Sequence, residues 1–234
     1  MYRLNDTDKL QDVSAFSTLD TRDRVMVHFS ARALRAKRAM DVVGALLFIC
    51  LFSPLFLAVT LGVILSSGAP VIYCQSRVGR KGRIFSFYKF RSMAHDSDEV
   101  LSSFLDSCAA ARSQWETHQK LDSDPRVTRF GRFIRRTSLD ELPQFWNILK
   151  GEMSLVGPRP CTPDQRRRYG HHWHIYCAIK PGLTGLWQVN GRNKLTYHER
   201  VEMDVRYARQ WSLWLDVKII AKTFWVVATG HGSQ

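Results

Sequence analysis

Two adjacent acidic residues, Asp140 and Glu141, follow a dense group of arginines in the middle of the chain. Neighbouring carboxylates can hold a divalent cation on bound phosphates, and one of them can then act as a nucleophile or a base. Guanidinium groups suit phosphate oxygens because they are planar, forked donors. The arginines are Arg126, Arg129, Arg132, Arg135 and Arg136. This pattern indicates a phosphate-binding site with a reactive carboxylate.

The same residues also have simpler interpretations. Ser138 and Glu141 have the spacing of a helix capping box, and acidic residues at a helix start interact favourably with the helix dipole. Pro143 predicts that this helix begins close to the acid pair. The arginines alone fit a solvated basic face or a surface for anionic lipid headgroups equally well. From this feature alone, both interpretations stay open.

Two further basic elements favour the phosphate site. Lys89 and Arg91 alternate with aromatic residues at strand spacing, which predicts that they share one face. Arg159 stands between Pro158 and Pro160, which form a rigid mount for its charge. Neither a Walker A nor a Rossmann glycine pattern occurs, so any nucleotide recognition does not use those loops. The eight histidines lack H-E-x-x-H spacing and are interpreted as surface or structural residues.

A long apolar segment adds a membrane to the interpretation. Residues 42–65 contain no charge, and about 20 apolar residues suffice to cross a bilayer as a helix. Basic residues flank both ends, although positive charge near a membrane segment prefers the cytoplasmic side. Ser53 and Pro54 lie at the midpoint, where proline bends a helix by removing a hydrogen bond. We therefore predict a re-entrant hairpin that breaks at Ser53 and Pro54; a spanning helix and a buried core helix are the alternatives.

Composition limits the class of protein. The 234 residues leave room for one domain, and 45% hydrophobic with 24% charged residues excludes a disordered chain. Lys and Arg number 34 against 21 Asp and Glu, and the net charge of +13 predicts a polyanionic partner: nucleic acid, anionic lipid or nucleotide phosphate. The five cysteines have no C-x-x-C spacing, so we expect free thiols rather than disulfides or a zinc site.

Local patterns predict the elements that position these residues. Two β-prone runs, 71–74 and 84–88, surround a turn at 79–82 and predict a hairpin. Helices are expected over 96–120, over 129–136, from about 140 to a stop at Gly151, over 197–210 and over 213–227, with loops at 158–163 and 181–182 and a tight turn at 190–191. The last helix carries tryptophans near lysines, which suits either a membrane surface or an ordinary amphipathic helix packed on the core.

Five motifs resemble, in order and spacing, those of the bacterial sugar transferases, the small monotopic phosphoglycosyl transferases that begin glycan assembly on polyprenyl phosphate. They are K-F-R-S-M from Lys89, S-L-D-E-L-P-Q from Ser138, M-S-L-V-G-P-R-P from Met153, P-G-L-T-G from Pro181 and Q-V-N-G-R from Gln188. Ser92 stands where threonine is common in the family. The resemblance extends over about residues 35–230.

This resemblance implies a specific reaction. Family members transfer a sugar-1-phosphate from a nucleotide diphosphosugar, usually UDP-linked, to undecaprenyl phosphate, and UMP leaves. The aspartate of the acid pair is the nucleophile and forms a phosphosugar–enzyme intermediate, which assigns that role to Asp140. Its neighbour Glu141 binds Mg²⁺. Together with the arginines selected above, the expected phosphate-binding residues are Lys89, Arg91, Arg126, Arg135, Arg136, Arg159 and Arg192.

The expected architecture combines the patterns with the resemblance. We predict an α+β, mostly helical fold, in which a re-entrant membrane helix hairpin carries a catalytic body with a small β-hairpin and surface-lying amphipathic helices. The division is a loose segment over 1–30, the anchor over 31–68 and the catalytic domain over 69–234. The resemblance implies an anchor that enters and leaves on the cytoplasmic side of the bacterial inner membrane.

The expected partners follow from the same resemblance. They are a UDP-sugar, undecaprenyl phosphate and membrane lipid, whereas downstream glycosyltransferases and a homodimer are left open. Nucleic acid is not expected, because it explains neither the apolar segment nor the acid pair. The insert over 96–124 and the stretch 185–187 resemble the hexose-1-phosphate branch of the family that starts exopolysaccharides, which implies galactose or glucose as the donor sugar. An N-acetylhexosamine donor is the alternative, and a basic membrane scaffold is the non-enzymatic one.

Overall fold

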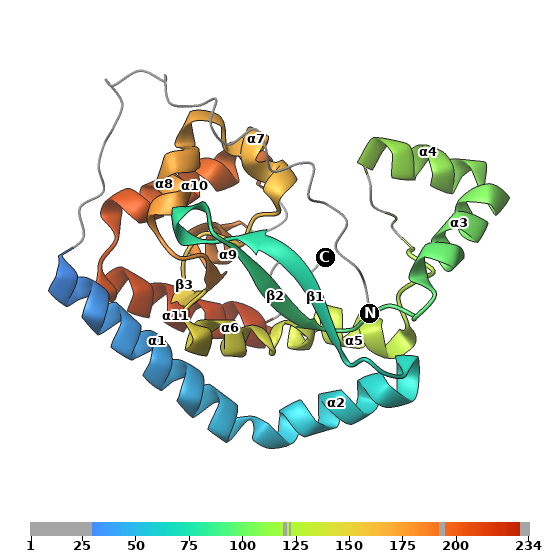
Figure 1. Ribbon diagram of the computed structural model, residues 1–234, viewed down its shortest axis with the longest axis horizontal. Coiled ribbons are helices and arrows are strands. Elements are labelled where there is room, and N and C mark those ends of the chain that lie inside the picture. Colours follow the sequence, from blue (N-terminus) through green and yellow to red (C-terminus); the bar gives the residue numbers. More distant parts are fainter. Residues whose placement is uncertain (1–29, 119–120, 122, 192–194, 230–234) are drawn as a thin grey trace.

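The computed structural model describes residues 30–118, 121, 123–191 and 195–229, and this part of the chain is mostly helical (Figure 1). The α-helices are α1 (Ala31–Leu51), α2 (Ser53–Ser67), α3 (Ser97–Ser107), α4 (Ala109–His118), α5 (Arg129–Arg136), α6 (Gln144–Lys150), α7 (Arg166–Tyr169), α8 (Trp173–Ala178), α9 (Leu186–Asn190), α10 (Tyr197–Gln210) and α11 (Leu213–Thr229). The strands are β1 (Ile72–Val78), β2 (Ile84–Phe90), β3 (Ser154–Val156) and β4 (Gly182–Thr184). Short 3-10 turns are η3 (Arg80–Gly82), η4 (Leu139–Glu141), η5 (Pro163–Gln165) and η6 (Gly170–His172). The loose segment predicted for 1–30 lies, apart from Ser30, outside the described residues.

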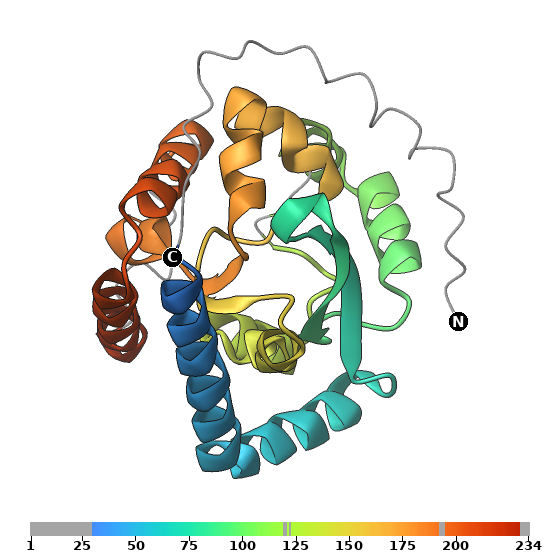
Figure 2. The same cartoon turned by 60° about the vertical axis from the view of Figure 1, so that its left-hand side comes forward.

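The first two helices form one bent unit, with the body of the protein inside the angle between them (Figure 2). Their axes differ by 66°, and the break falls at Phe52, directly before the predicted Ser53 and Pro54. Proline is tolerated in the first turn of α2 because its missing N–H is unpaired there in any helix. The Ser53 hydroxyl donates to the carbonyl of Cys50 at 3.0 Å, which satisfies one acceptor that the break releases. The predicted break is therefore confirmed.

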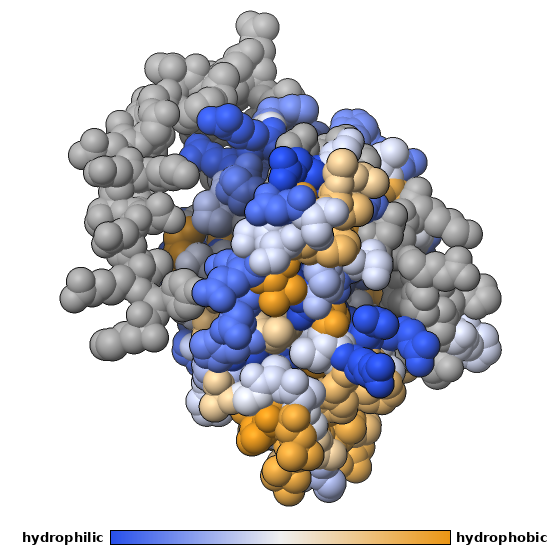
Figure 3. Space-filling view, turned by 90° about the vertical axis from the view of Figure 1, so that its right-hand side faces the viewer, coloured by the Kyte–Doolittle hydropathy of each residue, from blue (hydrophilic) through white to orange (hydrophobic). Residues whose placement is uncertain are grey.

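Apolar side chains cover the outside of this bent pair. Leu51, Leu57 and Leu65 are 73%, 61% and 87% exposed. In Figure 3 the hydrophobic surface gathers at the lower end of the molecule, where Figure 1 places α1 and α2. Among the described helices, none is by itself long and apolar enough to cross a bilayer, and α1 with α2 meets that criterion only as a bent pair. An outward apolar face of this size is unusual on a water-exposed surface.

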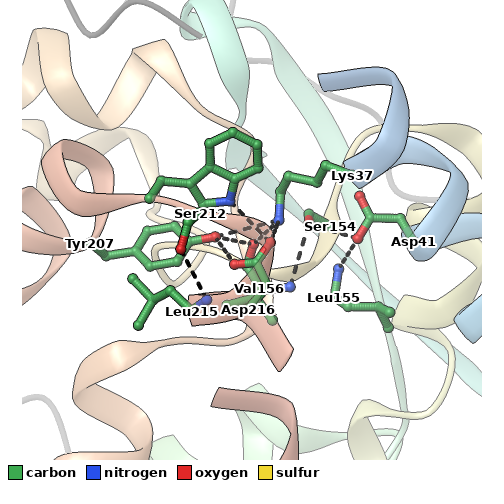
Figure 4. Close-up of polar contacts among 10 residues, drawn as sticks. Lys37, Asp41, Ser154, Leu155, Val156, Tyr207, Ser212, Leu215 and Asp216 are labelled. Carbon is green, nitrogen blue, oxygen red and sulfur yellow. Dashed lines mark hydrogen bonds and ion pairs between the residues drawn. The ribbon is translucent and has the colours of Figure 1, made fainter. Parts of the chain in front are cut away.

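A buried ion pair joins the first half of α1 to the body (Figure 4). Lys37 Nζ donates to Asp216 Oδ2 of α11 at 2.6 Å and to the carbonyl of Val156 in β3 at 3.0 Å. The remaining lone pairs of the carboxylate accept from Tyr207 OH at 2.7 Å and Trp211 Nε1 at 3.0 Å. The Asp216 side chain is fully buried, so these bonds replace its hydration. We call these five residues the anchor network.

Two more polar residues, Arg38 directly after Lys37 and Asp41 one turn further along α1, attach the helix to the body. Asp41 Oδ1 accepts from Ser154 Oγ at 2.8 Å and from the Leu155 N–H at 2.9 Å, which holds the start of β3 (Figure 4). The Arg38 guanidinium donates to the carbonyls of Ile148 and Leu149 at 2.6 and 2.7 Å. It therefore donates to two carbonyls at the end of α6, of which that of Ile148 also accepts from the Gly151 N–H at 2.9 Å, and a cation is favoured there by the helix dipole as well.

The predicted hairpin is present, and it is placed on α6 by one buried side chain. Strands β1 and β2 pair antiparallel, with Tyr73 opposite Lys89. Asn147 is fully buried; its Nδ2 donates to the Ser86 carbonyl at 2.7 Å, and its Oδ1 accepts from the Tyr88 N–H at 3.2 Å. Because Asn147 bonds β2 on both sides of Phe87, it fixes the position of the strand that carries Lys89.

The second sheet was not predicted. Strands β3 and β4 pair in parallel, with Ser154 opposite Gly182 and Val156 opposite Thr184. The predicted loop at 181–182 is therefore wrong in part, because Gly182 begins β4. The segments that follow β3 and precede β4 approach closely at Gly157, where an added Cβ would lie 2.4 Å from the carbonyl oxygen of Lys180. Only glycine fits at that position.

The single helix expected over 96–120 is also wrong. The chain forms α3 and α4, separated by Cys108 in an extended conformation with φ −136° and ψ 102°. The residues at 106–108, which are aspartate, serine and cysteine, are weaker helix formers than the leucine and the alanines on either side, which favours a break in this stretch. By contrast, α5 and α10 have the predicted bounds, and α11 runs two residues beyond the predicted end.

Candidate active site

The acid pair lies in η4 rather than at the start of α6, so the predicted helix start near Asp140 is wrong. Helix α6 begins at Gln144, immediately after Pro143, because proline inside a helix lacks the required N–H and clashes with the preceding turn. Ser138 has the left-handed conformation, with φ 59°, and its side chain makes no capping bond. The capping-box interpretation is therefore wrong, and Glu141 makes its contacts elsewhere.

The Glu141 carboxylate faces two cations. Lys89 Nζ lies 2.8 Å from Glu141 Oε1 and 3.1 Å from Asp140 Oδ2, so a single ammonium group bridges both acids. Arg159 Nη2 reaches the same Glu141 oxygen at 3.3 Å. The side chains of Asp140, Glu141 and Lys89 are only 10%, 19% and 22% exposed. The charges therefore interact in a partly desolvated site, where they are screened less than on an open surface.

The pKa values of the two neighbouring carboxyl groups are shifted in opposite directions. Burial raises the pKa of Asp140 above its usual value; the negative charge of Glu141 adds to this rise, and Lys89 opposes it. For Glu141, burial acts in the same sense, but the charges of Lys89 and Arg159 outweigh it and lower its pKa to about 2. Glu141 is thus a fixed anion at neutral pH, whereas Asp140 is the more basic carboxyl of the pair. Divergent pKa values in adjacent carboxyls are a frequent sign of different chemical roles.

Arg135 and Arg91 lie around the acids. The Nε of Arg135 donates to Ser92 Oγ at 2.7 Å. The charge of Arg135 opposes, in small part, the rise in the pKa of Asp140 that burial causes. The Nη1 atom of Arg91 is buried and has no hydrogen-bond partner within the part of the chain that is described. Both arginines line the same cavity as Asp140, so the structure brings these predicted residues together.

The remaining predicted cations differ in their surroundings. Arg126 forms a two-pronged ion pair with Asp124, with its shortest contact at 2.7 Å, and its guanidinium stacks on Trp115 at 4.9 Å. Its charge is therefore already compensated within the protein. Arg136 is exposed at the edge of the cavity and is free to meet a ligand from solvent. Arg192 lies outside the described residues.

The cavity that contains these groups has a volume of about 2110 Å³ and reaches the bent helix pair. Its lining includes both charged and apolar side chains. The charged ones include the acid pair with Lys89 and Arg159, and the apolar ones include Leu47, Leu51, Phe52 and Leu55 of the bent helix pair and its break. One cavity thus offers contacts for both a phosphate group and a hydrocarbon chain.

The acid pair supplies two adjacent carboxylates that could hold a metal. No cluster of three or more His, Cys, Asp or Glu side chains suited to a metal occurs among the residues with a described position. Mg²⁺ is usually held by one or two carboxylates together with substrate phosphates. Asp140 and Glu141 therefore fit a magnesium site that a bound substrate completes, and they do not fit a metal site formed by protein alone.

Two cations that line the cavity, Arg77 and Arg200, were not predicted. In the hairpin register Gln75 is opposite Phe87 and Arg77 is opposite Phe85, so Arg77 shares a face with Lys89. Pairing the two predicted strands around their turn and counting alternate residues would have identified it. The anchor network was missed as well, because nothing local marks Lys37 as buried.

The fold and the site together define a class: an α+β protein whose carboxylate–cation site opens onto a bent apolar helix pair. Residues 32–230 match the family described as bacterial sugar transferase. The chain belongs to the bacterial sugar transferase family, and the resemblance drawn from its motifs is confirmed.

Curated relatives carry names that describe sugar phosphotransferases. The chain is 46% identical over 211 residues to the undecaprenyl-phosphate galactose phosphotransferase of Salmonella typhimurium, covering 90% of this chain and 44% of the relative. It is 45% identical over 199 residues to the undecaprenyl-phosphate glucose phosphotransferase of Komagataeibacter xylinus, covering 80% of this chain and 35% of that relative. It is also 45% identical over 198 residues to the exopolysaccharide production protein ExoY of Rhizobium meliloti, covering 85% of this chain and 88% of ExoY. The chain thus spans less than half of the two phosphotransferases.

Proposed function

We propose that this protein is a phosphoglycosyl transferase that moves a hexose-1-phosphate from a UDP-sugar to undecaprenyl phosphate, the first membrane step in the assembly of an exopolysaccharide or related glycan. The observation that carries the proposal is the acid pair bridged by Lys89, inside a cavity that continues to the apolar anchor. A soluble diphosphosugar and a lipid phosphate need this combination of polar and apolar surroundings. The names of the relatives support the same class of reaction.

The reaction has two displacement steps on one phosphorus atom. In the first, a carboxylate oxygen of Asp140 attacks the phosphorus that bears the sugar; the bond to the UMP oxygen breaks, and UMP leaves with the electron pair. In the second, a phosphate oxygen of undecaprenyl phosphate attacks the same phosphorus, and the Asp140 oxygen leaves as a regenerated carboxylate. Two steps allow two very different substrates to use one site in turn. The raised pKa of Asp140 supports its role, because a more basic carboxylate is a better nucleophile.

The cations around Asp140 make this attack feasible. A carboxylate that approaches a diphosphate brings negative charge onto negative charge, and the repulsion grows as the site is desolvated. Lys89, Arg135 and Arg159 provide fixed positive charge that is already in place before the substrate arrives. Mg²⁺, held by Glu141 and by substrate phosphates, would add positive charge at the leaving group.

The anchor supports a re-entrant arrangement on the cytoplasmic face of the inner membrane. Its exposed leucines require an apolar environment, its bend is at the predicted position, and basic residues flank both ends. Single cysteines at the exposed positions Arg32 and Arg83, in a background free of other reactive thiols, should both react with an impermeant reagent from the cytoplasmic side. Opposite accessibility would establish a spanning segment.

The donor sugar is proposed to be galactose or glucose, which are the sugars in the names of the two phosphotransferase relatives. The test is to incubate the detergent-solubilised protein with undecaprenyl phosphate and UDP-galactose, UDP-glucose or UDP-N-acetylglucosamine, while UMP is measured. Release of UMP only from the N-acetylated donor would replace the proposed sugar by an N-acetylhexosamine. No release from any UDP-sugar would refute the reaction.

The nucleophile is tested with Asp140→Asn, and Asp164→Asn is the matched control because Asp164 is exposed. With a donor labelled in the sugar phosphate and no lipid acceptor, the wild type and the control should retain label on the protein. Asp140→Asn should retain none and should release no UMP. Turnover above a few per cent would exclude Asp140 as the nucleophile, and normal glycan production in cells with this variant would support the non-enzymatic scaffold.

A further inference from the structure

The segment that carries Arg159 is held at both ends. After β3, the Gly157 N–H donates to a β4 carbonyl at 2.9 Å, and the Pro158 carbonyl accepts from a β4 N–H at 2.8 Å. Beyond Arg159, the Cys161 carbonyl accepts from the Val78 N–H at the end of β1, also at 2.9 Å. The two prolines beside Arg159 remove further freedom at φ. The position of this cation is therefore set by β1 on one side and by β4 on the other.

On the β1 side, Arg77 bonds Pro160, the residue next to Arg159 in the sequence. Its Nη1 donates to the Pro160 carbonyl at 3.0 Å, and its Nη2 donates to Gln75 Oε1 at 2.7 Å. The guanidinium also lies over the ring of Phe87, 5.3 Å from its centre. Arg77 is thus held by its own hairpin on two sides and donates from Nη1 to the carbonyl of the residue that follows Arg159.

The charge of Arg77 is not compensated by any acid in the described part of the chain, whose ion pairs do not include it. Burial and the nearby charge of Arg159 both lower its pKa, so the two guanidinium groups repel one another. Arg159 meets a carboxylate on its other side, at Glu141. The repulsion and the bond to Pro160 therefore act together, and both favour the orientation of Arg159 toward the acid pair.

We propose that Arg77 is a positioning residue for Arg159: it holds the Pro158–Pro160 segment through the Pro160 carbonyl and directs the Arg159 guanidinium into the cavity. The inference rests on the proposed function in one respect, because its kinetic consequence requires that Arg159 contacts a substrate phosphate. A lysine at position 77 keeps the charge and loses the fork, so it separates positioning from charge alone.

The kinetic test is a double-mutant cycle with Arg77→Lys, Arg159→Lys and the double variant, and with Arg83→Lys as an exposed control on the same hairpin. We expect Arg77→Lys to lower kcat for UMP release about tenfold, the effect of a loss near 1.4 kcal/mol. In the Arg159→Lys background the same change should alter kcat less than twofold, because its target is already absent. Equal factors in both backgrounds would indicate general damage and would overturn the inference, as would unchanged kcat in Arg77→Lys.

A second measurement does not depend on turnover. In Arg159→Cys protein whose other exposed cysteines are replaced by serine, the rate of reaction with a neutral thiol reagent reports the position of residue 159. Arg77→Lys should change that rate several-fold, whereas Arg83→Lys should not. An unchanged rate would overturn the inference even if the protein releases UMP. A changed rate, together with no UMP release from any UDP-sugar by the protein that retains Arg77 and Arg159, would refute the proposed function and leave the positioning role intact.

Discussion

The anchor network allows a quantitative test, because its ion pair is buried and its partners are few. Lys37→Met removes the cation and leaves the Asp216 carboxylate, which has a fully buried side chain, with neutral donors only. Breaking a buried pair by removing one partner typically costs about 3–5 kcal/mol. For a chain of this length, about 2–4 °C per kcal/mol converts that loss to a fall of about 6–20 °C in Tm.

Removing the second charge should restore most of this loss. In Lys37→Met with Asp216→Asn, both charges of the buried ion pair are removed, and the asparagine oxygen still accepts from Tyr207 or Trp211. The Tyr207 hydroxyl can also donate to the Val156 carbonyl, 3.0 Å away, so at most one donor loses its acceptor, at a cost of about 1–2 kcal/mol. The double variant should therefore be more stable than Lys37→Met alone, although it contains one more substitution.

The assay is thermal unfolding of the detergent-solubilised proteins, followed by circular dichroism at one scan rate because such transitions are often irreversible. Arg35→Met is the matched control: Arg35 is an exposed cation on the same helix, and its loss should change stability by about 0.5 kcal/mol or less. If the double variant is less stable than Lys37→Met, the cost does not come from an unpaired buried charge, and the reasoning is wrong.

Three further predictions concern other parts of the molecule. Arg159→Lys should lower the transfer rate roughly thirtyfold, because about 2 kcal/mol of charge-assisted contact is lost at the transition state, while liposome binding stays unchanged; a normal rate would leave only a headgroup role. Burial raises the pKa of Asp204 to about 7, so the folded state holds a proton that the unfolded chain releases. The free energy of unfolding should therefore fall between about pH 4 and pH 7, by at most about 1.4 kcal/mol per unit, and Asp204→Asn should abolish that slope in denaturant titrations. Replacing Ser53 and Pro54 with leucines should straighten the anchor and move one flank across the membrane; unchanged labelling at both flanks would show that charge alone sets the topology.

Features that depend on local chemistry could be predicted from the sequence. The break before Pro54 follows from proline geometry, and the hairpin follows from two β-prone runs around a glycine-rich turn. Lys89 was expected near the acids and lies within hydrogen-bond distance of both. Each of these predictions needed only residues that are close in the sequence or a motif that names its own partners.

Features that depend on distant contacts could not be predicted in this way. Strands β3 and β4 are too short to show a period, and they exist because they pair with each other. Lys37 is one cation among several on α1, and only its contact with Asp216, far away in the sequence, gives it a buried role. The η4 turn was mistaken for a helix start because Ser138 and Glu141 have capping-box spacing, although the backbone at Ser138 is left-handed.

The attachment of Asp41 to β3 has a consequence for the lipids around the protein. A helix rises 1.5 Å per residue, so the stretch from Asp41 to the break at Phe52 is about 16 Å long, roughly half of a 30 Å hydrocarbon layer. Inserted as proposed, an anchor of this length would displace lipid from one leaflet and leave the opposite leaflet continuous beneath it. Each inserted molecule would then add area to one side of the bilayer only. Patches rich in the protein would therefore favour a membrane that is convex toward the catalytic body.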